Sequence, residues 1–121
     1  MVKVPVPGKS VRGSKSGSPI MAMFDLLGRR WAMGVLWTLS EQGPLTFRAL
    51  QDACETISPA VLNSRIKELR TAGFVELGDN GYLVTALGAE VYEALLPLSR
   101  VSTAWAEAIA QLESAETKTT D

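Results

Sequence analysis

Histidine is absent from this 121-residue sequence, and cysteine occurs once, as Cys54. These shortages exclude an intrachain disulfide, a zinc site made of Cys and His, and every catalytic dyad or triad that needs a histidine. No apolar run approaches the roughly 18 residues of a membrane helix, and the N-terminal residues lack the apolar core of a secretory signal. The sequence therefore predicts a cytoplasmic protein with no membrane association, no enzymatic function and no metal or cofactor.

Net charge is also small, because twelve Lys and Arg oppose thirteen Asp and Glu, which gives −1. The charges are nevertheless unevenly distributed along the chain. Residues 1–18 hold four bases and no acid, whereas residues 86–121 hold six acids and two bases. A basic N-terminal end and an acidic C-terminal end indicate a protein whose surfaces differ in charge.

The length corresponds to one small domain. We expect residues 1–18 to form a flexible basic arm, residues 19–113 to form the folded domain, and residues 114–121 to form a disordered tail, because both ends have little apolar content. Two functions for the arm are left open. It is either a solvated leader or a cationic segment that contacts phosphates.

Hydrophobic spacing and turn residues predict the elements of the domain. Ser18-Pro19 and Ser58-Pro59 each place a capping serine before a proline at the first helical position. Leu62, Ile66 and Leu69 have the spacing of one buried helical stripe. The predicted elements are helices over 19–27, 31–41, 48–54 and 59–71, an edge strand over 45–47, a hairpin over 74–85 with a Gly-Asp-Asn-Gly turn, and an amphipathic helix over 87–112, bent near Pro97.

In this order the elements resemble a winged helix-turn-helix. The motifs that carry a more specific resemblance lie between about residues 18 and 105. They are LLGRRW at 26–31, GPLTF at 43–47, ISP at 57–59 followed by Leu62, Arg65, Ile66 and Leu69, AGFVE at 72–76, TALG at 85–88, and Trp105. With this set the sequence is similar to the HxlR-type branch of the MarR-like winged-helix transcriptional regulators. The resemblance implies a mainly α-helical α+β fold with a small β-hairpin wing and a dimer interface formed by helices at both ends.

Three positions depart from the family pattern. Ser18 stands where many members have a cysteine used in sensing, so thiol sensing is not implied here. Asp79 lies at the tip of a hairpin that is usually longer and basic, and Ala60 stands where a base is common. These departures lower the expected affinity for DNA. Cys54 falls at an apolar position, which predicts a buried, inert thiol.

The position of the 59–71 helix in the resemblance implies that it is the recognition helix. The residues expected to contact DNA are Ser58, Pro59, Ala60, Asn63, Ser64, Arg65 and Lys67, supported by Thr46, Arg48 and Asn80. Asn63 and Ser64 suit base edges, and Lys67 and Arg65 suit phosphates or guanine. Arg65 lies on the flank, where pairing with a nearby carboxylate is the alternative. A structural helix with a solvated polar face is the alternative for the whole segment.

The last helix carries an apolar stripe that the rest of a small domain has little surface to cover. We expect it to pack, together with the first helix, against a second copy of the chain. The residues expected in this interface are Phe24, Val91, Leu95, Leu98, Trp105 and Ile109. The alternative is that the stripe folds back onto its own core.

Two functions remain after this reasoning. The first is a homodimeric, sequence-specific regulator, most simply a repressor, that binds a palindromic operator in double-stranded DNA and leaves room for a small-molecule effector of unknown identity. The second is a winged-helix dimer that binds proteins and has weak or no affinity for DNA. The neutral helix-turn-helix region and the acidic hairpin tip favour the second.

Overall fold

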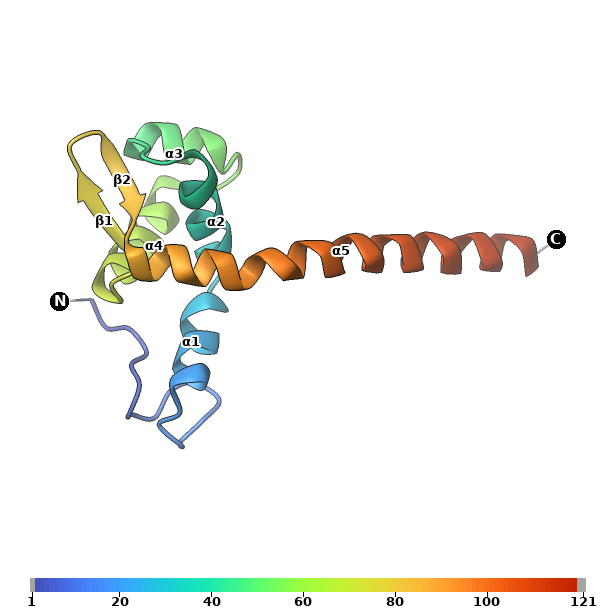
Figure 1. Cartoon of the computed structure of the whole chain (residues 1–121), viewed down its shortest axis with the longest axis horizontal. Coiled ribbons are helices and arrows are strands. Elements are labelled where there is room, and N and C mark those ends of the chain that lie inside the picture. Colours follow the sequence, from blue (N-terminus) through green and yellow to red (C-terminus); the bar gives the residue numbers. More distant parts are fainter. Residues whose placement is uncertain (1, 120–121) are drawn as a thin grey trace. The chain divides into compact units, whose positions relative to one another are not determined.

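The computed structural model describes residues 2–119, which form helices and one two-stranded antiparallel sheet (Figure 1). In chain order the elements are α1 (Pro19–Leu27), α2 (Ala32–Gln42), α3 (Phe47–Ala53), α4 (Pro59–Thr71), β1 (Val75–Gly78), β2 (Gly81–Val84) and α5 (Ala86–Thr119). The chain divides after Glu90 into two compact units. The first holds α1 to α4, the hairpin and the start of α5, and the second is the remainder of α5. None of the described helices combines the length and apolar character needed to cross a membrane.

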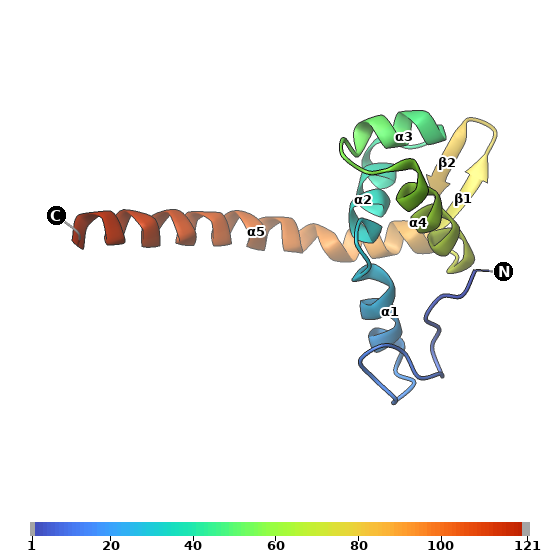
Figure 2. The same cartoon turned by 180° about the vertical axis from the view of Figure 1, so that it is seen from behind.

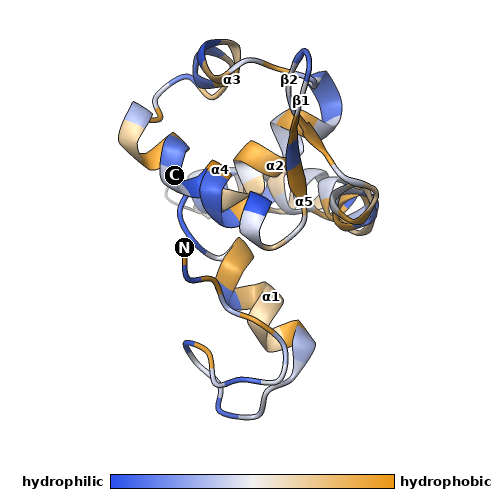
Figure 3. Cartoon of the chain, turned by 90° about the vertical axis from the view of Figure 1, so that its left-hand side faces the viewer, coloured by the Kyte–Doolittle hydropathy of each residue, from blue (hydrophilic) through white to orange (hydrophobic). Residues whose placement is uncertain are grey.

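The core of the first unit lies between α2 and α4, with the hairpin beside them (Figure 2). On α2 the buried residues are Ala32, Val35, Leu36 and Leu39, and on α4 the apolar ones are Leu62, Ile66 and Leu69. The predicted stripe of α4 is therefore confirmed. Most of α1 is hydrophobic in Figure 3, and Ala22, Leu26 and Leu27 are its buried residues. This arrangement of helices with a hairpin wing is a winged helix-turn-helix.

Side chains of Ser58 and Thr46 cap two of the helices, of which the sequence predicts only the Ser58 cap. The Ser58 hydroxyl accepts a hydrogen bond from the Val61 N–H at 3.2 Å, and the Thr46 hydroxyl accepts one from the Ala49 N–H at 3.2 Å. Ser18 also precedes its helix, but its side chain makes no capping hydrogen bond. The proline at the first position therefore begins α1 without that contribution.

The predicted hairpin is confirmed, with Val75 opposite Val84 and Gly78 opposite Gly81. Gly81 has a φ of +122°, and a Cβ at this position would overlap the Leu45 backbone. The close approach lets Leu45 and Tyr82 exchange two backbone hydrogen bonds, of 2.9 and 2.7 Å. The edge strand predicted over 45–47 is wrong in extent, because Leu45 forms only this single bridge and α3 already begins at Phe47.

Helix boundaries differ from the predicted ones at both ends of the domain. Trp31 has a left-handed φ of 75°, so α2 begins one residue later than predicted. Pro97 lies inside α5, and the helix continues through it without interruption. The disordered tail predicted from residue 114 is wrong up to Thr119, where α5 ends. Residues 120 and 121 of that tail lie outside the described residues.

The N-terminal arm makes contacts of its own in the structure. The Gly8 N–H donates to the Gly17 carbonyl at 2.8 Å, and Val11 and Ser14 exchange two backbone hydrogen bonds. The Arg12 N–H also donates to the Asp25 carboxylate on α1 at 3.3 Å. The arm thus turns back on itself beside α1, while its flexibility remains a prediction.

Candidate nucleic-acid interface

The α4 helix presents a continuous polar face on the side opposite its buried stripe. Ala60, Asn63, Ser64, Lys67 and Thr71 are all exposed. Their spacing of three and four residues places them along one side of the helix. The first turn adds exposed Ser58 and Pro59, so six of the seven residues predicted on this helix are exposed. Short polar side chains on an open helix face can reach the edges of bases in a major groove.

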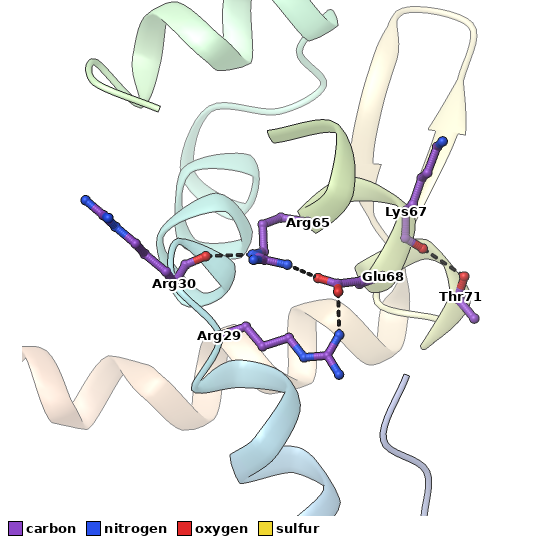
Figure 4. Close-up of polar contacts among 6 residues, drawn as sticks. All are labelled: Arg29, Arg30, Arg65, Lys67, Glu68 and Thr71. Carbon is purple, nitrogen blue, oxygen red and sulfur yellow. Dashed lines mark hydrogen bonds and ion pairs between the residues drawn. The ribbon is translucent and has the colours of Figure 1, made fainter. Parts of the chain in front are cut away.

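Arg65 is the seventh predicted residue, and its side chain points away from the exposed face, toward Glu68 and the turn after α1. Its guanidinium forms an ion pair with Glu68, and its Nε donates to the Arg30 carbonyl at 2.7 Å. Figure 4 shows Arg65 and Lys67 leaving α4 on different sides. The carboxylate pairing, which the sequence left as the alternative for Arg65, is therefore present.

Glu68 was not among the residues predicted from the sequence to matter in this region. It is 9% exposed and the single buried charged residue among those described. Its two carboxylate oxygens bind two arginines, Arg29 and Arg65. The Arg65 spacing of three residues is a recognisable helical pair, but nothing in the sequence connects position 68 with position 29. Through this ion pair, Arg29 joins the turn after α1 to α4.

The supporting residues lie on two further elements. Thr46 and Arg48 are exposed at the start of α3, and Asn80 is exposed in the hairpin turn. The backbone of Leu45 and Thr46 lies against Gly81, the residue after Asn80, so the start of α3 is beside the hairpin. Thr46 also uses its hydroxyl to cap α3.

Arg70 is the third base on α4, after Arg65 and Lys67, and was not among the predicted DNA contacts. It is exposed, and its guanidinium carbon lies 6.0 Å from the centre of the Tyr82 ring. With Lys67 it lines an open hollow of about 460 Å³, whose other lining residues are Val2, Thr71, Val75 and Glu76. The beginning of the arm therefore lies beside two bases of α4.

The residues predicted in the dimer interface differ in the exposed fraction of their side chains. Phe24 on α1 is 60% exposed, and Trp105 on α5 is 67% exposed. Leu98 and Ile109 are also exposed and Leu95 is half-buried, whereas Val91 is buried within the single chain. Val91 therefore has little surface to give to a partner. In the second unit, the stripe lies on a helix with no other element of that unit to cover it.

Cys54 is buried, as predicted, with its Sγ 4.0 Å from the Thr38 hydroxyl. Burial raises the pKa of the Cys54 thiol, and the hydrogen bond with Thr38 opposes this increase. A raised pKa means less thiolate at neutral pH, and the thiolate is the reactive form.

We therefore expect Cys54 in the folded protein to react with iodoacetamide at least about tenfold more slowly at pH 7 than the same thiol in urea. Mass spectrometry of the alkylated protein over time measures both rates. Cys54→Ser provides the blank. Equal rates in the folded and unfolded protein would contradict a protected thiol.

Comparison with known proteins agrees with this architecture. The family model of HxlR-like helix-turn-helix proteins matches residues 26–110. An uncharacterised HTH-type transcriptional regulator of Halalkalibacterium halodurans is 32% identical over 59 residues, which are 49% of this chain. The chain spans about half of that relative's length, 52%.

Solved structures with a similar fold include three that differ in identity and coverage. The quinone-bound form of YodB from B. subtilis is 31% identical, with a TM-score of 0.60 over 73% of this chain and 94% of YodB. A possible HxlR family transcriptional factor from Thermoplasma volcanium is 26% identical, with a TM-score of 0.59 over 68% of this chain and 79% of that one. A MarR family protein of Mycobacterium tuberculosis shares the fold. It is 20% identical, with a TM-score of 0.58 over 83% of this chain and 81% of that protein.

Proposed function

The chain belongs to the HxlR-like helix-turn-helix family of transcriptional regulators, and we propose that it is a homodimeric repressor that binds a palindromic operator in double-stranded DNA. The observation that carries this proposal is the exposed polar face of α4. A helix held by a buried stripe on one side, with short polar residues on the other, is suited to enter a major groove.

Different residues of this face have different roles in the proposed complex. Asn63 and Ser64 provide hydrogen bonds to base edges, and Lys67 provides charge for a phosphate. Ser58, Pro59 and Ala60 allow the first turn of α4 to approach the groove closely, because their side chains are small or compact. Thr46, Arg48 and Asn80 support binding from α3 and the hairpin turn.

A second copy of the chain supplies the second half of the site. The supporting observation is the exposed apolar stripe of α5, which includes Leu98, Trp105 and Ile109. A two-fold dimer presents two α4 helices and therefore suits a palindromic sequence. The buried thiol of Cys54 makes it a poor sensor, so we propose that any small-molecule effector acts without thiol chemistry.

A mobility-shift titration tests DNA binding. The probe is the duplex upstream of the protein's own gene, and the competitor is a random-sequence duplex of equal length. A specific regulator is expected to bind its operator about 10³-fold or more tightly than random DNA, and to lose affinity steeply as salt increases. Equal affinity for both duplexes at every salt concentration would contradict a sequence-specific regulator.

The second candidate function, a protein-interaction module, is favoured by the acidic wing. Glu76 and Asp79 are both exposed on the hairpin, where negative charge repels phosphates. A dimer with no measurable affinity for either duplex at low salt would support this function over the first.

Deleting residues 2–15 is expected to weaken the salt dependence of DNA binding while sequence preference persists. The deletion removes Lys3, Lys9, Arg12 and Lys15, and the arm begins beside Lys67 and Arg70. The salt slope is the magnitude of the slope of log K against log salt, and each phosphate contact that is lost lowers it by about 0.9. A variant with the four bases replaced by glutamine is the control for the loss of chain length. An unchanged slope in both proteins would show that the arm does not contact phosphates.

A further inference from the structure

Glu68 is unusual because it is a charged group inside the core of the domain. Its side chain is 12% exposed. A buried carboxylate is unfavourable unless charged or hydrogen-bonding partners compensate for the lost water. Arg29 binds Oε2 and Arg65 binds Oε1, so each carboxylate oxygen has an arginine partner. Among the described residues, no buried side-chain nitrogen or oxygen lacks a hydrogen-bond partner.

The pairing determines where the Arg65 side chain lies. Arg65 follows Asn63 and Ser64 on α4 and comes two residues before Lys67. Lys67 is exposed, whereas the Arg65 side chain is 19% exposed because Glu68 and the Arg30 carbonyl hold it toward the turn after α1 (Figure 4). Without these two acceptors, a long cationic side chain at this position would be available to nearby phosphates.

We propose that Glu68 is a positioning residue for DNA recognition, because it holds Arg65 away from the DNA backbone. This inference rests on the proposed DNA binding. A phosphate contact increases affinity for every sequence equally, whereas contacts from Asn63 and Ser64 discriminate between sequences. Keeping one cation off the phosphates therefore lowers affinity for all DNA by a similar factor, and leaves a larger share of the binding free energy to the contacts of Asn63 and Ser64.

Salt titrations with a random-sequence duplex test the role of Arg65 in the intact protein. Arg65→Gln is expected to leave the slope of log K against log salt unchanged. Lys67→Gln is the matched comparison on the exposed face, and it is expected to lower the magnitude of this slope, the salt slope, by about 0.9 per protomer. If Arg65→Gln lowers the salt slope as much as Lys67→Gln does, Arg65 contacts phosphate directly, and this overturns the proposal.

Glu68→Gln tests the holding role, because glutamine has nearly the same shape and no charge. The variant is expected to release Arg65, to raise the salt slope by about 0.9 per protomer, and to bind random DNA more tightly. The ratio of operator to random affinity is expected to stay close to the wild-type value, because a phosphate contact increases both affinities by a similar factor. The operator is taken as a duplex selected by the wild-type protein from a random pool. The double variant Glu68→Gln/Arg65→Gln is expected to return the slope to its wild-type value.

Two controls separate positioning from a purely structural role. Arg29→Gln disturbs the same cluster but leaves the Arg65–Glu68 pair, so its salt slope is expected to match the wild type. A raised slope in Arg29→Gln, or one that persists in the double variant, would overturn the proposal. An unchanged slope in folded Glu68→Gln would also overturn it. Circular dichroism and thermal unfolding check each fold, and if Glu68→Gln does not fold, the Arg65→Gln comparison decides.

Failure of the proposed function gives a different result. A wild-type protein that binds neither duplex at low salt contradicts DNA binding itself and, with it, any role of Glu68 in recognition. A wild-type protein that binds both, with variants that depart from the expected slopes, contradicts the role of Glu68 alone.

Discussion

Replacing Trp105 with glutamate is expected to convert the proposed dimer into a monomer at micromolar concentration and to lower affinity for its proposed operator at least about 100-fold. Trp105 is 67% exposed on a helix whose stripe has no cover within its own unit. If a second copy covers this stripe, the new carboxylate has no partner there, at a cost of about 3 kcal/mol or more. Since each 1.4 kcal/mol is about tenfold, this cost explains the expected loss.

Sedimentation of the wild type and Trp105→Glu measures the assembly, and a mobility shift measures the operator affinity. Thr103→Glu is the matched control, because it adds the same charge to α5 on the opposite side from Trp105. The control is expected to remain dimeric. A wild-type protein that is monomeric at micromolar concentration would refute the dimer.

The dimer also has a geometric requirement. Two α4 helices that enter successive major grooves on one side of B-DNA lie about 34–36 Å apart. A crystal structure of the dimer gives this distance directly. A dimer in which the two α4 helices cover each other would instead favour the protein-interaction module.

Replacing Asn63 with alanine is expected to remove most discrimination at the base pair that it contacts. The loss corresponds to about 1–3 kcal/mol at each half-site, because one good side-chain contact to a base edge contributes that much. Two half-sites double the effect in a symmetric dimer. Affinity for random DNA is expected to remain close to the wild-type value, since phosphate contacts are unaffected. Competition titrations with operator and random duplexes measure both quantities, and Ser64→Ala is expected to behave in the same way.

Lys67→Ala is the contrasting variant on the same face of α4. It is expected to weaken binding to both duplexes by a similar factor, because a phosphate contact carries no sequence information. Asn63→Ala with full operator preference would show that a different face of α4 lies in the groove. Both side chains are exposed, so neither substitution is expected to change the free energy of unfolding by more than about 0.5 kcal/mol.

Local chemistry made much of the fold predictable. The serine before proline at position 58 predicted the start of α4, and the structure shows the capping hydrogen bond to the Val61 N–H. The turn at Asp79-Asn80 predicted the hairpin, which forms with the expected strands. These features depend on residues within a few positions of one another, and such interactions can be recognised from spacing alone.

The disagreements arise where the decisive partner is distant or where a local preference is overridden. Leu45 forms a bridge instead of a strand because its partner is Tyr82 in the hairpin. Residues 114–119 are helical despite their polar composition, because they extend α5 and extending an existing helix avoids the cost of nucleating a new one. Trp31 has a positive φ, which the apolar pattern around it gave no reason to expect.

The order of the elements, the buried stripe of α4 and the polar face opposite it follow from local sequence, because helical periodicity decides which residues share a side. The role of Arg65, in contrast, depends on how the elements pack. Glu68, three residues after Arg65, also binds Arg29, which is 39 residues away in the chain and comes close only when the turn after α1 lies beside α4. Spacing identifies the side chains that share a helix face, but the partners of a charged group depend on how the helices pack.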